Sequence, residues 1–177
     1  TLMFDPDEDT YPDYMRTYLG NTSFMEDADI ISLSSNVNDI QITLLEEPAP
    51  GEGSSNASGN LIEEEEGAKR GLKMKQGQYT GDGIPVMDVP VFLLNTLGEI
   101  EYADITDSEG NFNFNTIELG EYFFRADYEA YPMSAQNDTL LVTEEGQEFE
   151  LIAIISAGEI SCGITKLPTN TDIWNDL

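Results

Sequence analysis

Alternating aspartates near the start of the chain have the spacing of a calcium-binding loop. Asp5, Asp7 and Asp9 stand at every second position, and carboxylate oxygens so spaced are typical ligands of Ca²⁺. A full EF-hand loop is excluded, because Thr10 occupies the position of its glycine and Arg16 that of its final bidentate glutamate. The sequence therefore predicts a looser calcium site formed by these aspartates.

The side chains on which most hydrolases depend are missing. The sequence contains no histidine, so neither a Ser-His-Asp nor a Cys-His arrangement nor an imidazole metal site can form within the chain. Cys162 stands in the apolar alternation from Ile160 to Ile164, which predicts a small buried core residue. Asp104 and Asp107 have the proximity of a glycosidase acid and base, but 35 acidic residues make such proximity expected by chance. We therefore predict a protein that is not an enzyme.

The net charge of the chain limits the classes of partner that it can bind. Seven Lys and Arg residues accompany 35 Asp and Glu residues, for a formal net charge of -28 at pH 7. This charge repels phosphate backbones and anionic lipid surfaces, so we expect neither nucleic acid nor membrane insertion. No apolar run reaches the length that spans a bilayer. Calcium is the one cofactor expected, because hard divalent cations relieve repulsion between carboxylates.

The sequence divides into segments of different composition. Residues 1–47 carry three short apolar runs, too few strands to close a sandwich, and we interpret them as the C-terminal part of a preceding β-sandwich repeat. Pro, Gly and Ser replace periodic hydrophobic residues over 48–56, which predicts a linker. Residues 57–165 have enough apolar positions for one complete sandwich. Because the chain starts without an initiator Met or a signal-peptide pattern, we expect a longer parent polypeptide.

Residues 57–165 alternate in the manner of β-strands and show no sustained helical periodicity, which predicts an all-β antiparallel fold with little helix. The run 89–94 is apolar on both faces, which indicates a strand covered on both sides. After Gly120, Tyr122, Phe124 and Ala126 share one face of a strand, and the residues between them share the other. The expected strands lie near residues 60–63, 89–94, 99–105, 112–114, 120–127, 140–143, 149–155 and 160–165.

Three motifs follow one another in this region. The first is GIPVMDVPVFLL at 83–94, the second TDSEGNFNF at 106–114, and the third LGEY at 119–122. Together they resemble the carboxypeptidase-regulatory-like, Cna-B-like and SdrD-B-like family. The resemblance implies a transthyretin-like (prealbumin-like, Ig-like) β-sandwich over 57–165, preceded by the C-terminal strands of a similar module. Such modules serve as stalks, spacers and occasional ligand binders on secreted proteins.

Two further segments resemble parts of large secreted proteins of Bacteroidetes. The sequence YMRTYLGNT at 14–22 is similar to a segment that follows comparable repeats in those proteins. Residues 166–177 resemble the linker ahead of a type IX secretion sorting domain. The resemblance implies an extracellular or cell-surface protein from which the sorting domain has been removed.

These observations lead us to expect a structural or adhesive module of a secreted cell-surface protein, with neighbouring sandwich modules as partners. A glycan-binding module is the alternative, because exposed aromatic rings offer stacking faces to sugars. A third reading is a filament subunit, in which strand edges of residues 1–47 are completed by strand addition from another copy. The aromatic candidates for glycan stacking are Tyr11, Tyr14, Tyr18, Tyr128, Tyr131 and Trp174.

One modification site is also expected. The tripeptide Asp138-Thr139-Leu140 resembles the acceptor motif of Bacteroidetes O-glycosylation. It stands at the entry to a strand, where a bulky sugar can reach solvent. Thr139 is therefore the predicted glycosylated residue.

Overall fold

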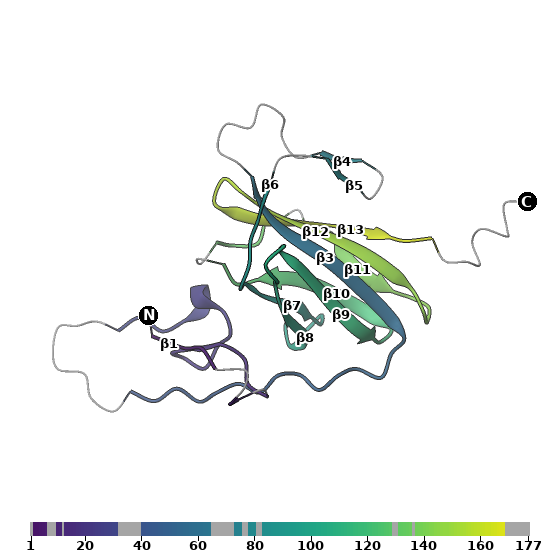
Figure 1. Ribbon diagram of the computed structural model, residues 1–177. Helices are drawn as coiled ribbons and strands as arrows, with labels where there is room; N and C mark the ends of the chain where they lie inside the picture. The colour runs from purple at the N-terminus through teal and green to yellow at the C-terminus, as the bar shows by residue number, and fades with distance from the viewer. Residues whose placement is uncertain are drawn as a thin grey trace, which may run out of the picture.

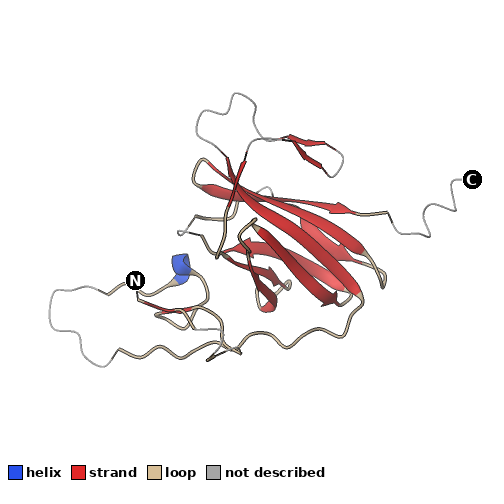
Figure 2. Ribbon diagram, viewed as in Figure 1, coloured by secondary structure: helices blue, strands red, loops and turns tan. Residues whose placement is uncertain are grey.

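The computed structural model describes residues 2–6, 10–11, 13–31, 40–64, 73–75, 78–80, 83–128, 131–135 and 137–168. Within these residues the regular structure is β-strand, apart from the single 3₁₀ turn η1 (Met25–Asp27) (Figures 1 and 2). The prediction of an all-β sandwich with little helix is confirmed. The larger strands form two sheets that pack face to face, and we name them the β7 sheet and the β3 sheet after one strand of each.

The β7 sheet has four antiparallel strands in the order β11-β10-β7-β8. Their bounds are Thr139–Val142 for β11, Gly120–Ala126 for β10, Pro90–Leu94 for β7 and Ile100–Ile105 for β8. Every residue of β7 is buried, which confirms that this strand is covered on both faces. The turn between β8 and β9 ends at Gly110, whose φ of 75° lies in the left-handed region that glycine tolerates best.

The β3 sheet has the order β13-β12-β3, with β9 and β6 end to end along the other edge of β3. The strands run over Ser55–Glu64 (β3), Gly83–Pro85 (β6), Asn111–Ile117 (β9), Glu148–Ser156 (β12) and Glu159–Lys166 (β13). All strand pairs of the two sheets are antiparallel except β12 and β3, which pair in parallel. This one pair departs from the purely antiparallel sandwich expected from the sequence.

The first strand of the sandwich begins earlier than the expected residues 60–63. β3 starts at Ser55, inside the segment 48–56 that the composition assigns to a linker. Ser55 and Ala57 point inward and are fully buried, while Asn56 and Ser58 between them are exposed. The alternation of a strand is therefore present here in small and polar residues, which composition alone does not distinguish from a linker.

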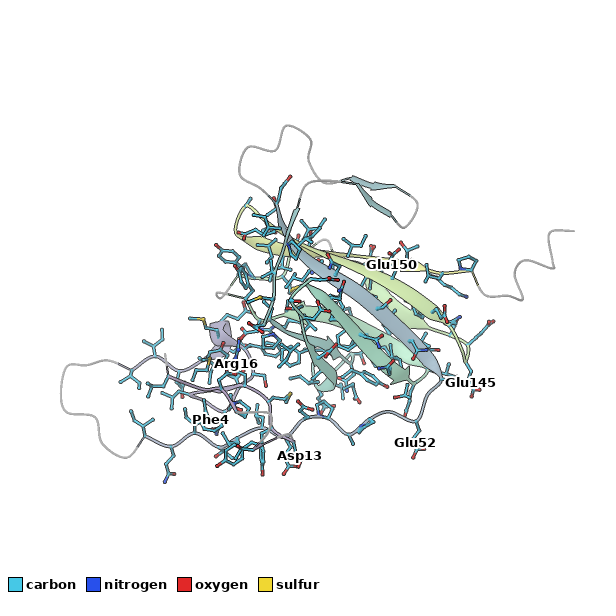
Figure 3. All side chains as sticks on the ribbon, in the orientation of Figure 1. Phe4, Asp13, Arg16, Glu52, Glu145 and Glu150 are labelled. Carbon is cyan, nitrogen blue, oxygen red and sulfur yellow. The ribbon has the colours of Figure 1, made fainter. Side chains whose placement is uncertain are left out.

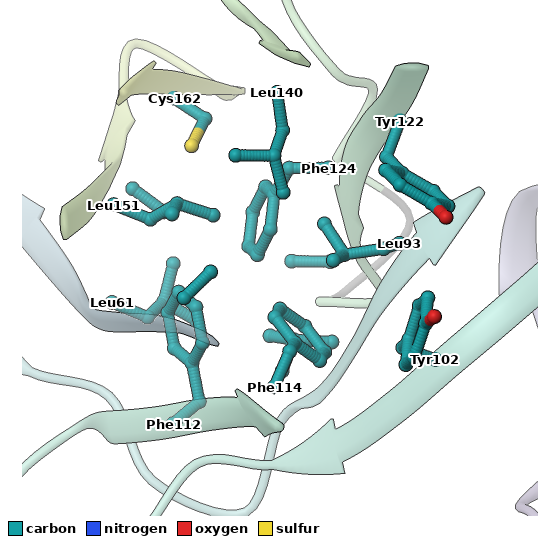
Figure 4. Packing of buried hydrophobic residues seen from close by; sticks show 14 of the residues in the cluster. Leu61, Leu93, Tyr102, Phe112, Phe114, Tyr122, Phe124, Leu140, Leu151 and Cys162 are labelled. Atoms are coloured by element: carbon teal, nitrogen blue, oxygen red, sulfur yellow. The ribbon is translucent and has the colours of Figure 1, made fainter. Parts of the chain in front are cut away.

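The main core lies between the two sheets (Figure 4). Leu93 and Phe124 contribute to it from the β7 sheet, and Leu61, Phe112 and Leu151 contribute from the β3 sheet. The rings of Phe112 and Phe124 stack across the interior with their centroids 5.3 Å apart. Aromatic stacking of this kind adds to the free energy gained by removing apolar area from water.

Cys162 belongs to this core, as its place in the apolar alternation predicts. Its side chain lies among those of the main core, and the residue is 3% exposed. Burial raises the pKa of the thiol far above its ordinary value, with a smaller contribution from the charge of Asp138. A buried thiol that stays protonated is a poor nucleophile, so Cys162 acts as a small apolar residue.

Two small two-stranded sheets lie outside the sandwich. The strands β1 (Met3–Phe4) and β2 (Thr17–Tyr18) pair near the N-terminus, and β4 (Lys73–Lys75) pairs with β5 (Gln78–Thr80). Residues 40–45 are the last of the three short apolar runs within residues 1–47, which we expected to be strands, but no strand forms here. Their backbone bonds go partly to side chains instead, since Thr43 N–H donates to Asn21 Oδ1 and Leu45 N–H donates to Thr17 Oγ1.

Candidate functional site

The N-terminal segment, by which we mean the described residues between 2 and 47, packs on the outer face of the β7 sheet through a second apolar cluster. Phe24 meets Phe92 edge to face, with ring centroids 5.2 Å apart, and Met15 and Leu94 complete the buried part of the cluster. The guanidinium carbon of Arg125 lies 3.4 Å from the centroid of the Phe24 ring, a cation–π contact. Because the N-terminal segment covers the outer face of β7 with this apolar cluster, both faces of β7 are apolar.

Asp127 fixes the same junction by hydrogen bonds. Its Oδ2 accepts from the Tyr18 hydroxyl at 2.6 Å, and its Oδ1 accepts from the Met25 backbone N–H at 2.9 Å. Burial, followed by the hydrogen bond to Asp127, raises the pKa of Tyr18 well above its ordinary value, so this hydroxyl remains a donor at neutral pH. Arg125 adds ion pairs with Glu26 and Asp27 of η1.

Replacing Asp127 by alanine is expected to lower the free energy of unfolding by about 1–3 kcal/mol, because the Tyr18 hydroxyl and the Met25 N–H lose their acceptor. Urea denaturation would measure the loss. The control is Asp27→Ala, which removes a carboxylate that is 56% exposed and is expected to cost less than about 1 kcal/mol. Equal losses for the two variants would contradict the role assigned to Asp127.

A cleft of about 440 Å³ lies beside this junction, between the start of the chain and the outer face of β7 and β8. Arg16, which is labelled in Figure 3, forms one wall. Its Nε and Nη2 donate to Asp5 Oδ1 and Oδ2 at 2.8 and 3.1 Å. Tyr11 and Tyr14 stand at the cleft with their rings edge to face, 6.5 Å between centroids. The other lining residues are Pro6, Met15, Glu47, Pro90, Phe92, Ala103, Asp104 and Ile105.

The Arg16–Asp5 pair is charged and planar. Burial lowers the pKa of Arg16, but the hydrogen bond and charge of Asp5, with smaller contributions from Tyr18 and Asp127, raise it more. The guanidinium is therefore charged at any pH at which the protein is folded. A bidentate pair of this geometry holds both side chains in defined positions at the cleft.

The predicted calcium ligands are only partly placed by the structure. Asp5 directs both carboxylate oxygens at Arg16, whereas Asp7 and Asp9 lie outside the described residues. Among the residues that the structure describes, no three acidic or thiol side chains gather closely enough to hold a metal ion. A site using Asp5 would have to share its oxygens between the cation and the guanidinium.

The calcium site stays a prediction with a simple test. If the aspartates bind calcium in the native state alone, millimolar calcium is expected to raise the melting temperature, because a ligand of the native state stabilises by mass action. Thermal unfolding in calcium and in chelator, for the natural sequence and for Asp7→Asn, measures the effect. Identical melting curves in calcium and chelator would contradict it.

The carboxylates of Asp104 and Asp107 are directed at backbone amides. Asp107 Oδ1 accepts from the N–H groups of Glu109 and Asn111, and Asp104 Oδ2 accepts from that of Asn113. The hydrogen bonds from Asn111, then that from Glu109, lower the pKa of Asp107. Both side chains border a groove of about 680 Å³ beside β3, β9 and β12, where their arrangement stabilises the turn between β8 and β9.

The aromatic residues expected to stack on sugars fall into different environments. Tyr11 and Tyr14 line the cleft, and Tyr18 is buried against Asp127. Tyr128 and Tyr131 pack against the main core and contact each other with centroids 5.8 Å apart. Trp174 lies outside the described residues. The structure thus brings two of these aromatic side chains together at one cavity.

Thr139 is the first residue of the edge strand β11, where its side chain is exposed. We expect the protein purified from its natural source to carry a glycan there, because the exposed side chain lets a sugar reach solvent. Peptide mass spectrometry would detect the added mass, and Thr139→Ala would remove it. An unmodified peptide mass over Thr139 in the natural protein would refute the prediction.

The residues of the junction were not identified from the sequence. Phe24 lies far along the chain from Arg125 and Asp127, and only the apolar outer face of β7 indicated that something covers it. No helix in the described part of the chain has the length and apolar character that crossing a membrane requires.

Comparisons with protein-family models, curated proteins and solved structures found no match.

Proposed function

We propose that the chain is a non-enzymatic structural and adhesive module of a secreted cell-surface protein. The observation that carries the proposal is the fixed junction between the N-terminal segment and the sandwich, built from the Phe24–Phe92 contact and the buried Asp127. A spacer must hold its neighbours at a defined orientation, and an apolar contact with buried hydrogen bonds does this better than a flexible linker.

Further features of the chain agree with this proposal. The sequence lacks histidine, and the carboxylates of Asp104 and Asp107 accept hydrogen bonds from the backbone of the sandwich. The resemblance of the motifs between residues 83 and 122 to modules of stalks and spacers supports the same reading. Neighbouring sandwich modules are the proposed partners, and the cell surface or the extracellular medium is the proposed location.

Small-angle X-ray scattering tests the junction. The natural chain is expected to scatter as a unit in which the N-terminal segment stays docked, whereas the double variant Phe24→Ala/Asp127→Ala is expected to have a larger maximum dimension. A natural chain that scatters like the double variant would contradict a fixed junction.

Protease treatment of intact cells that carry the parent protein tests the location, since peptides of this module should be released before lysis.

A further inference from the structure

The cleft between the N-terminal segment and the β7 sheet combines aromatic, charged and apolar side chains in one cavity. Its volume of about 440 Å³ lies within the range of roughly 300–1,000 Å³ found for small-molecule sites. Pro90, Phe92 and Ala103 give it an apolar floor, which is the outer face of the sheet. We propose that this cleft binds an uncharged carbohydrate, with one sugar ring on Tyr11 and its hydroxyl groups on the Arg16–Asp5 pair.

Tyr11 is a fixed and accessible platform. The residue is 45% exposed, yet its ring makes edge-to-face contacts with two neighbouring rings, Phe4 at 6.1 Å and Tyr14 at 6.5 Å between centroids. An aromatic ring carries partial negative charge on its face, which attracts the partially positive C–H bonds on the apolar face of a pyranose. Because neighbouring rings already hold Tyr11, a ligand loses little entropy by ordering it.

The polar wall matches hydroxyl groups better than ions. A guanidinium has five N–H donors, and Asp5 takes two of those of Arg16, so the pair presents donors and acceptors side by side. A sugar hydroxyl both donates and accepts, and vicinal hydroxyls match a planar pair of this kind. The side chain of Arg16 is 20% exposed and that of Asp5 52% exposed, so a ligand in the cleft can reach both.

The charges at the cleft disfavour the competing ligands. An anion would approach a chain of net charge -28 and meet Asp5, Glu47 and Asp104 in the lining. A cation would be attracted by the same charge, but inside the cleft it would meet the Arg16 guanidinium, which repels it and already occupies both oxygens of Asp5. An uncharged ligand that can both donate and accept hydrogen bonds is therefore the class that the lining favours.

The test is to titrate the natural chain with a panel of neutral oligosaccharides that contain glucose, mannose, xylose or N-acetylglucosamine. Binding is measured by NMR and by calorimetry. Sialylated oligosaccharides and oligolysine serve as the anionic and cationic probes. At least one neutral oligosaccharide is expected to bind and to shift the amide signals of Tyr11, of residues 13–16 and of residues 103–105. Absence of binding by every neutral member at millimolar concentration, or tighter binding of either charged probe, would overturn the proposal.

Two substitutions locate the site. Tyr11→Ala is expected to weaken binding of that oligosaccharide about tenfold or more, because it removes the stacking face. Phe123→Ala removes an aromatic side chain of similar exposure, 43%, that does not line the cleft, and is expected to leave affinity unchanged. Melting curves of both variants separate a loss of binding from a loss of folding. Equal affinities for Tyr11→Ala and the natural chain would place the ligand elsewhere and overturn the assignment.

Discussion

Replacing Phe124 by alanine is expected to lower the free energy of unfolding by about 3–5 kcal/mol. Phe124 is 3% exposed, and its ring stacks on Phe112 from the opposite sheet, so the substitution leaves a cavity in the centre of the main core. The surrounding strands are held by their ladders and cannot close such a cavity completely. Urea denaturation at neutral pH, with m-values compared between variants, measures the loss.

Phe123, the preceding residue, provides the control. It lies on the same strand but points to the other face, where it is 43% exposed, so Phe123→Ala is expected to cost less than about 1 kcal/mol. The two variants remove the same atoms from adjacent positions and differ only in burial. Similar losses would contradict the placement of the core between the sheets.

Replacing Gly110 by alanine is expected to lower the free energy of unfolding by about 2–5 kcal/mol through two separate effects. The φ of 75° is strained for a residue with a Cβ atom, by about 1–2 kcal/mol. A Cβ would also lie 2.5 Å from the carbonyl oxygen of Leu61, which accepts the hydrogen bond of Val86 N–H. Backbone must therefore move, and overpacking of this kind costs about 1–3 kcal/mol more.

Gly98 separates the two effects because it shares the first and lacks the second. Its φ is 81°, and nothing lies within 4 Å of the position of its Cβ, so Gly98→Ala is expected to cost about 1–2 kcal/mol. Thermal unfolding of both variants gives the difference directly. A Gly98→Ala variant as unstable as Gly110→Ala would show that strain alone accounts for both losses.

The alternation of apolar residues predicts which side of each strand faces the core. Tyr122, Phe124 and Ala126 belong to the main core as expected, and so does Cys162. The same alternation does not say which strands are neighbours, because pairing depends on the path of the whole chain. The parallel pairing of β12 with β3 therefore comes from the structure alone.

The cleft is a second feature that the sequence predicts only in part. Residue types predicted that tyrosines offer stacking faces and that acidic residues gather near the start of the chain. The partner of Asp5 is Arg16, the residue that stands where a calcium loop would have its last ligand. Tyr18 is buried in the junction while Tyr11 lines the cleft, and the difference arises from docking on β7, which local sequence does not encode.

The two ends of the sandwich meet at one end of the β3 sheet. Phe149 pairs with Lys166 on one side and with Ala57 on the other, so the first strand starts where the last strand finishes. A sandwich alone would take in and release the polypeptide there, about 10 Å apart, two strand spacings. Modules before and after it would then compete for the same space.

The docked segment removes this crowding. Residues 48–54 run back beside the sandwich, held by bonds such as that from Gly53 N–H to the Thr116 carbonyl, until they reach the segment on the outer face of β7 (Figure 1). The polypeptide therefore enters the combined unit at a site remote from Lys166, where it leaves the last strand. If modules are joined through these two ends, as the proposed function requires, they can follow one another in a line, each adding its own length, where bare sandwiches would fold back on themselves.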